Sequence, residues 1–172
     1  MILLHDIARH KRPITLVLDI IPGLITLRDH SSTTMPWQKV ITLERRSKGC
    51  HLVTDEILPQ ISEGLRQTPV GILHLFIQHT SAALTVNENY DPDVRTDMSM
   101  ALDRIVPESM PWLHTDEGPD DSVSHTKTSL IGPSLHIPIT NNRLNLGTWQ
   151  GIYLAEFRHA PHSRRVVCTI LP

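Results

Sequence analysis

Residues 70–78 read VGILHLFIQ, a short apolar run that limits the folds open to this chain. The run is far too short to cross a bilayer as a helix, which takes about 20 apolar residues. A continuous apolar stretch of this length is typical of a strand that is buried on both faces. We therefore predict a fully buried strand here. No other stretch is long enough to span a bilayer, so we expect no membrane partner.

Other short strands are predicted on both sides of this run. The stretch WQKVITLERR alternates apolar and polar residues from Val40 onward, which indicates a strand with one buried face. A short extended piece follows at residues 51–53. Four further strands, at residues 134–139, 143–146, 152–157 and 165–170, are separated by Gly, Pro and Asn. This pattern is typical of antiparallel meanders.

Two helices are predicted between the strands. The first has Thr54 as a possible N-cap and Gly64 near its end, and the second has Asp91 as N-cap and Pro92 at its first position. Their apolar stripes are Ile57, Ile61 and Leu65 in the first helix and Val94, Met98, Ala101, Leu102 and Ile105 in the second. Strands outnumber helices without regular alternation, so we predict an α+β fold, a single domain with an antiparallel-rich sheet or sandwich and two main helices.

The length of 172 residues suits one domain with a short extension. We expect residues 1–34 to lie outside the core and residues 35–172 to form the domain. The apolar stretch at 14–27 is interrupted by Asp19 and Pro22 and lacks the cleavage pattern of a secretory signal. With only two cysteines and no disulfide framework, a reducing compartment is the default, so we expect a cytoplasmic protein.

Charge and composition argue against a nucleic-acid partner. The net charge is -2, so the chain has no excess of positive charge with which to neutralise nucleic-acid phosphates. Aromatic residues make up 4% of the chain, which leaves few platforms on which bases could stack.

Eleven histidines are the unusual feature of the composition. Three of them, His79, His114 and His125, stand in polar surroundings, and histidine is the commonest metal ligand. Imidazole nitrogen together with carboxylate oxygen suits a divalent ion such as zinc. Their spacing matches no recognised metal motif, so a loop histidine bonded to backbone remains an alternative for each.

Acidic residues gather beside two of these histidines. Asp116, Glu117, Asp120 and Asp121 could hold magnesium, accept hydrogen bonds from ligating histidines, or simply form a solvated loop. Asp97 lies inside the second predicted helix, one residue before an apolar position, and is a further candidate for acid or base chemistry.

Hydroxyl and amide groups supply candidates for substrate binding. Thr80 and Ser81, and Thr148 after Gly147, could receive a phosphate, although neither pair has the glycine spacing of a P-loop. Asn87 beside the second helix and Gln150 beside the glycine turn complete the candidates. Trp149 is expected to be a buried anchor at the start of a strand, because large aromatic residues contribute much core burial.

Three long blocks carry a family resemblance. They are LHLFIQHTSAALTVNENYDPDVRTDM, HTDEGPDDSVSHTKTSLIGPSLHIPI and LNLGTWQGIYLAEFRHAPHSRRVV. In this order they resemble the YjbQ-like family, often labelled secondary thiamine-phosphate synthases, from about Met35 to the C-terminus. The resemblance implies an α+β fold assembled as a homotrimer. It also implies a metal site on His79, His114 and His125, with Asp97, Asp120 and Asp121 as acidic neighbours. The segment RHAPHSRR departs from the family pattern, so the roles of His159 and His162 stay open.

The resemblance further implies a reaction that joins hydroxymethylpyrimidine diphosphate to hydroxyethylthiazole phosphate and releases pyrophosphate. This chemistry needs a cation beside the departing pyrophosphate, so we expect a divalent metal ion, zinc or magnesium, and a small phosphorylated metabolite as partner. Two alternatives use the same site. One is metal-dependent hydrolysis of a phosphorylated or amide metabolite, and the other is a trimeric protein that binds a small metabolite without turnover.

Overall fold

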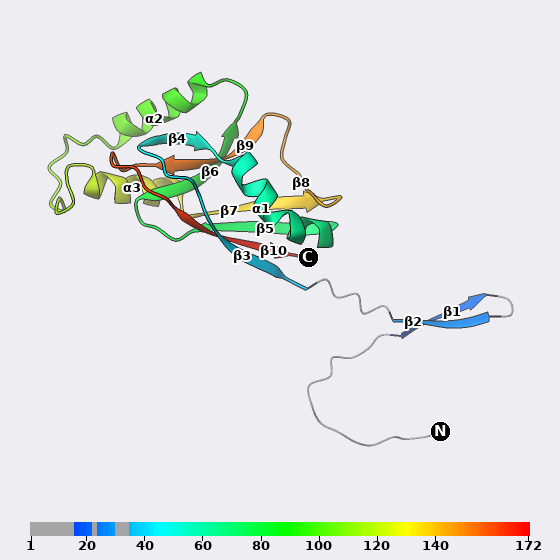
Figure 1. Ribbon diagram of the computed structural model, residues 1–172. Helices are drawn as coiled ribbons and strands as arrows, with labels where there is room; N and C mark the ends of the chain where they lie inside the picture. The colour runs from blue at the N-terminus through cyan, green and yellow to red at the C-terminus, as the bar shows by residue number, and fades with distance from the viewer. Residues whose placement is uncertain (1–15, 22–23, 30–34) are drawn as a thin grey trace, which may run out of the picture. The chain divides into compact units, whose positions relative to one another are not determined.

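Two antiparallel sheets form the framework of residues 35–172 in the computed structural model (Figure 1). The larger sheet has the strand order β3-β10-β5-β7-β8 and the smaller has the order β4-β9-β6. The strands are β3 Trp37–Thr42, β4 Gly49–Leu52, β5 Val70–Ile77, β6 Ala82–Glu88, β7 Ser134–Thr140, β8 Arg143–Leu144, β9 Gln150–Glu156 and β10 Arg165–Leu171. The helices are α1 Thr54–Gln67, α2 Asp93–Ile105 and α3 Asp121–Ile131. The prediction of an α+β fold is confirmed.

The small sheet forms the middle layer of this fold. One of its faces carries Leu84, Ile152 and Leu154, which pack with α1 and the inner face of the large sheet in the main core. Its other face carries Tyr153 and Ala155, which pack against residues of α2 and α3. Strand β9 is therefore buried on both faces over nearly its whole length.

The third helix, α3, corrects the prediction of two main helices. The sequence does not predict this helix because it has no continuous apolar stripe. The face that it buries carries Ser124, Lys127 and Thr128 as well as Val123. The Lys127 ammonium is satisfied by Asp103 of α2, with Nζ 2.5 Å from Oδ1. A polar buried face of this kind leaves no hydrophobic period for sequence reasoning to detect.

Strand β5 lies where the run VGILHLFIQ predicts it, but it is not buried on both faces. Leu73, Leu75 and Ile77 point into the core, whereas Ile72 and Phe76 are 45% and 40% exposed. Register explains the alternation, since the neighbours of Phe76 and Ile72 on β10 are the outward-facing residues Val167 and Leu171. Helix α1 contacts β3 and β10 of the large sheet from the inner face, where Ile57, Ile61 and Leu65 join the core.

Strand β6 was missed because two alanines open it, and alanine is a weak strand former. Pairing with β9 along all seven residues supplies the order that local propensity lacks. The strand separates His79 from Asn87 and Glu88, which lie at its far end. The candidate residues Thr80 and Asn87 therefore lie at opposite ends of β6.

The helix ends differ in detail from the predictions. Thr54 does not cap α1, and its Oγ1 instead accepts a hydrogen bond from the Ile152 amide at 2.8 Å. Asp91 does accept one from the Asp93 amide at 2.9 Å, although α2 begins one residue later than predicted, at Asp93 rather than Pro92. Gly64 does not end α1 but lies buried inside it.

The structure describes residues 16–21, 24–29 and 35–172, and the chain divides into two units, residues 1–34 and 35–172. In the first unit β1 (Leu16–Ile21) pairs antiparallel with β2 (Leu24–Asp29). Residues 1–15, 22–23 and 30–34 of the expected extension lie outside the described residues. Within the described part of the chain, no helix has the length and apolar character needed to span a membrane.

Close packing at Gly64 generates the first prediction. A Cβ added there would lie 2.6 Å from Cδ2 of Trp37 and 2.8 Å from Cδ1 of Ile170. Gly64→Ala should therefore lower the free energy of unfolding by about 1–3 kcal/mol, although helix propensity alone favours Ala by about 1 kcal/mol. Urea unfolding measures this, with exposed Glu63→Ala on the same helix as control. A Gly64→Ala protein that is more stable than wild type would contradict the packing argument.

Candidate functional site

A cavity of about 490 Å³ opens where the segment after β5, the start of α3 and the segment after β9 meet. These three segments are far apart in the sequence, and the tertiary fold brings them together. The cavity is lined by His79, Thr80, Ser81, His114, Glu117, Asp121, His125, Arg158 and His162.

Asp121 is the centre of this cavity. Its carboxylate is 1% exposed and lies in the first turn of α3, where the positive end of the helix dipole favours negative charge. Its Oδ2 accepts a hydrogen bond from the Glu117 amide at 3.1 Å, and its Oδ1 accepts one from Nη1 of Arg158 at 3.1 Å. Each oxygen also faces a histidine, with Nε2 of His114 at 3.2 Å from Oδ2 and Nε2 of His125 at 3.1 Å from Oδ1.

His125 has an oxygen acceptor at both ring nitrogens. Its Nδ1 lies 2.8 Å from the Thr80 carbonyl, which can only accept, so Nδ1 carries a hydrogen. In a neutral ring Nε2 then holds a lone pair, yet this atom faces the Asp121 carboxylate. A proton or a metal ion between these two atoms would satisfy both lone pairs.

The donor set of this cluster fits a divalent metal ion. The ligand atoms of His114, Asp121 and His125 all lie within 4.8 Å of one another. Two atoms that each lie about 2.1 Å from one tetrahedral ion are roughly 3.4 Å apart, close to the nitrogen–oxygen distances in the cluster. Asp121, predicted as a catalytic or supporting acid, thus stands among the candidate ligands. His79 lines the same cavity but is not a member of this cluster.

His79 is bonded to the segment that follows it. Its Nδ1 accepts a hydrogen bond from the Ser81 amide at 3.1 Å and lies 3.0 Å from Oγ of Ser81. That hydroxyl in turn accepts a bond from Nη2 of Arg164 at 3.2 Å. Burial and the nearby Arg164 cation lower the pKa of His79 below its ordinary value. Ser81, predicted to bind substrate, is buried and already engaged in this chain of bonds.

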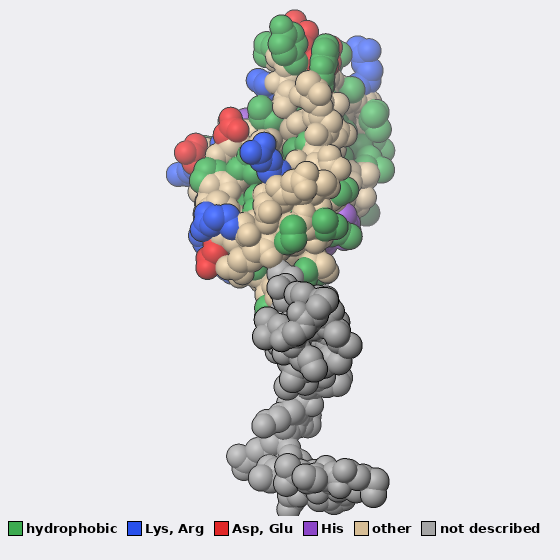
Figure 2. Space-filling view, turned by 90° about the vertical axis from the view of Figure 1, so that its right-hand side faces the viewer, with side chains coloured by type: hydrophobic (Ala, Val, Ile, Leu, Met, Phe, Trp, Pro, Cys, Tyr) green, Lys and Arg blue, Asp and Glu red, His purple; other side chains and the backbone are tan. Residues whose placement is uncertain are grey.

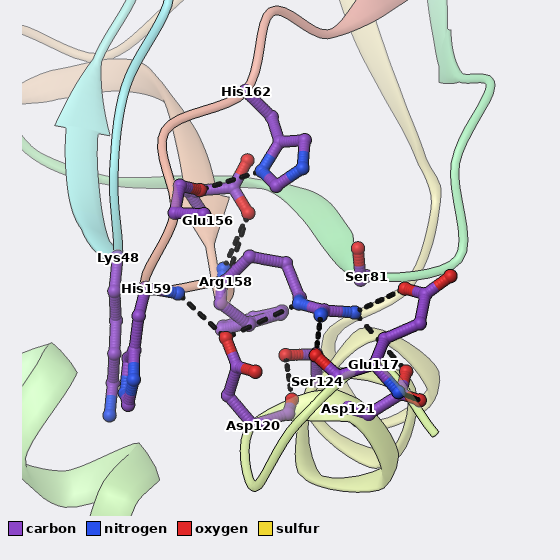
Figure 3. A network of polar contacts seen from close by, with 12 residues as sticks. Lys48, Ser81, Glu117, Asp120, Asp121, Ser124, Glu156, Arg158, His159 and His162 are labelled. Carbon is purple, nitrogen blue, oxygen red and sulfur yellow. Dashed lines mark hydrogen bonds and ion pairs between the residues drawn. The ribbon is translucent and has the colours of Figure 1, made fainter. Parts of the chain in front are cut away.

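Arg158 connects the acidic residues of the α2–α3 segment to the end of β9 (Figure 3). Its guanidinium lies 2.9 Å from Glu117 Oε2, 3.2 Å from Asp120 Oδ2 and 3.1 Å from Asp121 Oδ1. Burial would raise the pKa of Asp120, but the His159 amide and the Arg158 cation outweigh it and hold that pKa below its ordinary value. Asp120, a predicted catalytic acid, is therefore an ionised partner of Arg158.

A second buried ion pair lies beside His79. Arg164 donates to Glu156 through Nε at 2.5 Å and Nη2 at 2.7 Å, and both residues are 1% exposed. Sequence reasoning missed Glu156, Arg158 and Arg164. The available signal was a glutamate at the end of the apolar strand GIYLAE, because a buried carboxylate requires a cation nearby.

Other predicted site residues lie away from the cavity. Asp97 is exposed on α2 and does not line it. Asn87 is five residues beyond Ala82 on β6, about 17 Å at the rise of a strand, and bonds Met98 Sδ at 2.8 Å. Gln150 pairs with Glu88 at that same far end.

The turn before β9 holds the remaining candidates. Gln150 closes it by accepting a hydrogen bond from the Gly147 amide at 2.8 Å. Thr148 lies in the same turn and does not line the cavity. Trp149 is 60% exposed and lies beside Tyr90 with the two rings tilted by 37°, so the prediction of a buried anchor is wrong.

The structure shows where His159 and His162 lie, the two histidines whose roles the sequence left open. His162 lines the cavity, and its Nδ1 lies 2.6 Å from the Ala160 carbonyl. His159 is outside it, with Nε2 2.9 Å from Glu108 Oε1.

Comparison with known proteins confirms the family resemblance. A family model described as UPF0047 protein YjbQ-like matches residues 39–172. The chain is 48% identical over 136 residues to UPF0047 protein YjbQ of Escherichia coli O157:H7, which covers 79% of this chain and 98% of the relative. It is 37% identical over 149 residues to a UPF0047 protein of Synechocystis sp., which covers 86% and 95%.

Solved structures agree with this result. A protein of the YjbQ/UPF0047 family from Clostridium acetobutylicum matches with a TM-score of 0.64 at 34% identity, over 80% of this chain and 99% of that one. A YbjQ-like protein of unknown function from Sulfolobus solfataricus P2 matches with a TM-score of 0.71 over 79% of this chain and 96% of that one; at 20% identity it supports the fold alone. The chain therefore belongs to the UPF0047 protein YjbQ-like family.

Proposed function

We propose that the cavity is a divalent-metal site held by His114, Asp121 and His125, and that the protein is a metal-dependent enzyme acting on a small phosphorylated metabolite. The observation that carries this proposal is the setting of His125, whose two ring nitrogens both face oxygen acceptors. A divalent ion, zinc or magnesium, satisfies the second contact and suits the nitrogen and oxygen donors present.

Charge supports the same proposal. The residues of the cavity lining that carry full charges are Glu117, Asp121 and Arg158, and the two carboxylates outweigh the one guanidinium. Arg158 is also fully engaged with acidic partners, so it offers little to an anion. A phosphorylated ligand would be repelled by this lining unless a divalent cation were bound.

The reaction that we propose joins hydroxymethylpyrimidine diphosphate to hydroxyethylthiazole phosphate, as the family resemblance implies. A divalent ion would supply the positive charge that holds the diphosphate and stabilises negative charge on the leaving pyrophosphate. Asp121 and Arg158 hold the donor groups in place, since their buried contacts fix the carboxylate orientation. Thr80 lines the cavity and is the hydroxyl-bearing residue best placed to contact the ligand.

We also propose that the protein assembles as a homotrimer. Apolar side chains reach the surface of the domain (Figure 2). On the outer face of the large sheet these include Val40, Ile72, Phe76 and Leu171. Adjacent exposed apolar side chains on one sheet face are typical of an interface between subunits.

Loss of a proposed ligand should abolish metal binding. Asp121→Asn and His125→Ala should each weaken zinc binding by at least about 100-fold, more than the loss of a supporting residue costs. Zinc affinity should also fall as the pH is lowered, because histidine and carboxylate bind metal in their deprotonated forms. Competition titration with a zinc-binding dye measures both effects, with exposed Asp97→Asn as the matched control. Unchanged affinity in both ligand variants would refute the site.

Activity should depend on the same residues. Metal-loaded protein given the two phosphorylated precursors should form thiamine phosphate, whereas Asp121→Asn should not and Asp97→Asn should retain the rate of wild type. Chromatography of the products measures this. Pyrophosphate or phosphate release without thiamine phosphate would favour hydrolysis instead. Ligand-induced thermal stabilisation with neither product would favour binding without turnover.

The assembly proposal predicts the effect of a charge on the outer sheet face. Ile72→Lys should shift the protein from trimer to monomer, because burying an unpaired ammonium in an apolar interface is unfavourable. Light scattering after size exclusion measures the mass, and exposed Thr96→Lys on α2 is the control with the same new side chain. A monomeric wild-type protein would refute the trimer.

A further inference from the structure

We propose that His79 is not a metal ligand but a neutral hydrogen-bond donor, held in the tautomer that presents Nε2–H to the ligand in the cavity. This inference rests on the proposed metal-dependent function, because it assigns His79 a role beside the metal held by His114, Asp121 and His125. It departs from the expectation that three histidines hold the ion.

The first step is the contact at Nδ1. The Ser81 amide lies 3.1 Å from this atom, and a backbone N–H can only donate. Nδ1 must therefore accept, which means that it carries no hydrogen. A neutral imidazole has one N–H, so the hydrogen of His79 resides on Nε2.

The hydroxyl of Ser81 reinforces this tautomer. Arg164 Nη2 lies 3.2 Å from Oγ, and a guanidinium can only donate, so Oγ accepts from it. The single hydroxyl hydrogen is then left for Nδ1 of His79, 3.0 Å away. Arg164 cannot turn away from this role because Glu156 binds both Nε and Nη2 in the interior.

The second step concerns the metal. Nε2 of His79 carries a hydrogen and so has no lone pair for a cation. The lone pair of Nδ1 already accepts hydrogen bonds from Ser81. His125 has the opposite tautomer, since its Nδ1–H faces the Thr80 carbonyl and leaves Nε2 free to bind. The Thr80 carbonyl and the Ser81 amide belong to one peptide group. The carbonyl of this peptide group therefore leaves Nε2 of His125 free to bind the metal, and its amide leaves Nε2 of His79 as a hydrogen-bond donor.

The position of His79 between two hollows places its Nε2–H where a ligand could accept a hydrogen bond from it. A second, open groove of about 780 Å³ shares His79, Thr80 and His125 with the metal-site cavity, and its other walls include Phe76 and Pro133. His79 thus lies at the junction of the two hollows. A ligand that extends from the groove to the metal passes within reach of its Nε2–H, which would touch the ligand directly.

Zinc titration of single variants tests the metal part of the proposal. His79→Ala should bind one zinc with an affinity within about 3-fold of wild type, whereas His125→Ala should lose at least about 100-fold. Loss of zinc in His79→Ala to the same degree as in His125→Ala would overturn the inference while leaving the metal site standing. Retention in both variants, or no zinc in wild type, would instead refute the proposed function.

The tautomer itself is measured by NMR of protein labelled with ¹⁵N-histidine. The His79 resonances, assigned by their absence in His79→Ala, should show hydrogen on Nε2 and none on Nδ1, both before and after zinc is added. His125 should show hydrogen on Nδ1, and its Nε2 should respond to zinc. A hydrogen on Nδ1 of His79, or loss of the Nε2 hydrogen with zinc, would overturn the assignment. This readout does not depend on activity or on the identity of the substrate.

Discussion

The buried ion pair between Glu156 and Arg164 holds together the segments that build the cavity. Arg164 reaches Ser81 after β5, and Glu156 accepts the amides of Phe157 and Arg158. These bonds fix the direction of the chain as it leaves β9. Removing one partner of such a pair leaves an unpaired buried charge, which costs about 3–5 kcal/mol. The orientation of His79 and the placement of Arg158 both depend on this contact.

A second cation, Arg158, makes the acidic part of the cavity possible. Three carboxylates, of which Asp120 and Asp121 are buried and Glu117 is exposed, would repel one another at this short range, and the guanidinium offsets that repulsion through a separate contact to each. Asp121 gains a further favourable field from the first turn of α3. The result is a carboxylate that is held in place between two imidazole rings. Such a group attracts a positive ion without any movement of the backbone.

Sequence reasoning predicted the fold class, the strands β5, β7, β9 and β10 near their observed positions, and two of the three helices. These elements carry strong local patterns of apolar residues or turn signals. It failed on α3 and β6, which depend on tertiary partners. Lys127 is buried in α3 only because Asp103 of another helix pairs with it. Ala82 and Ala83 extend as a strand only because β9 binds them.

Some residues of the candidate site could likewise be predicted from the sequence, and others could not. His114, Asp120, Asp121 and His125 stand out in the sequence because they lie close together in a polar stretch. Asp97 was predicted from its place inside the second helix and from the family resemblance, but its side chain lies on the exposed face of α2. Glu156 and Arg164, which orient the site, could not be predicted without knowing which strand ends lie next to each other.

The distribution of the cavity residues along the chain also has a kinetic consequence. They extend from His79 to His162, and Arg164, which fixes His79, comes later still. During synthesis, β5, β6 and α3 leave the ribosome well before β9 and β10, the strands that pair with β6 and β5. Contacts this distant in sequence form late, because loop-closure entropy must first be overcome. We therefore expect the nascent chain to acquire the geometry of the cavity only once β9 and β10 have paired with β6 and β5.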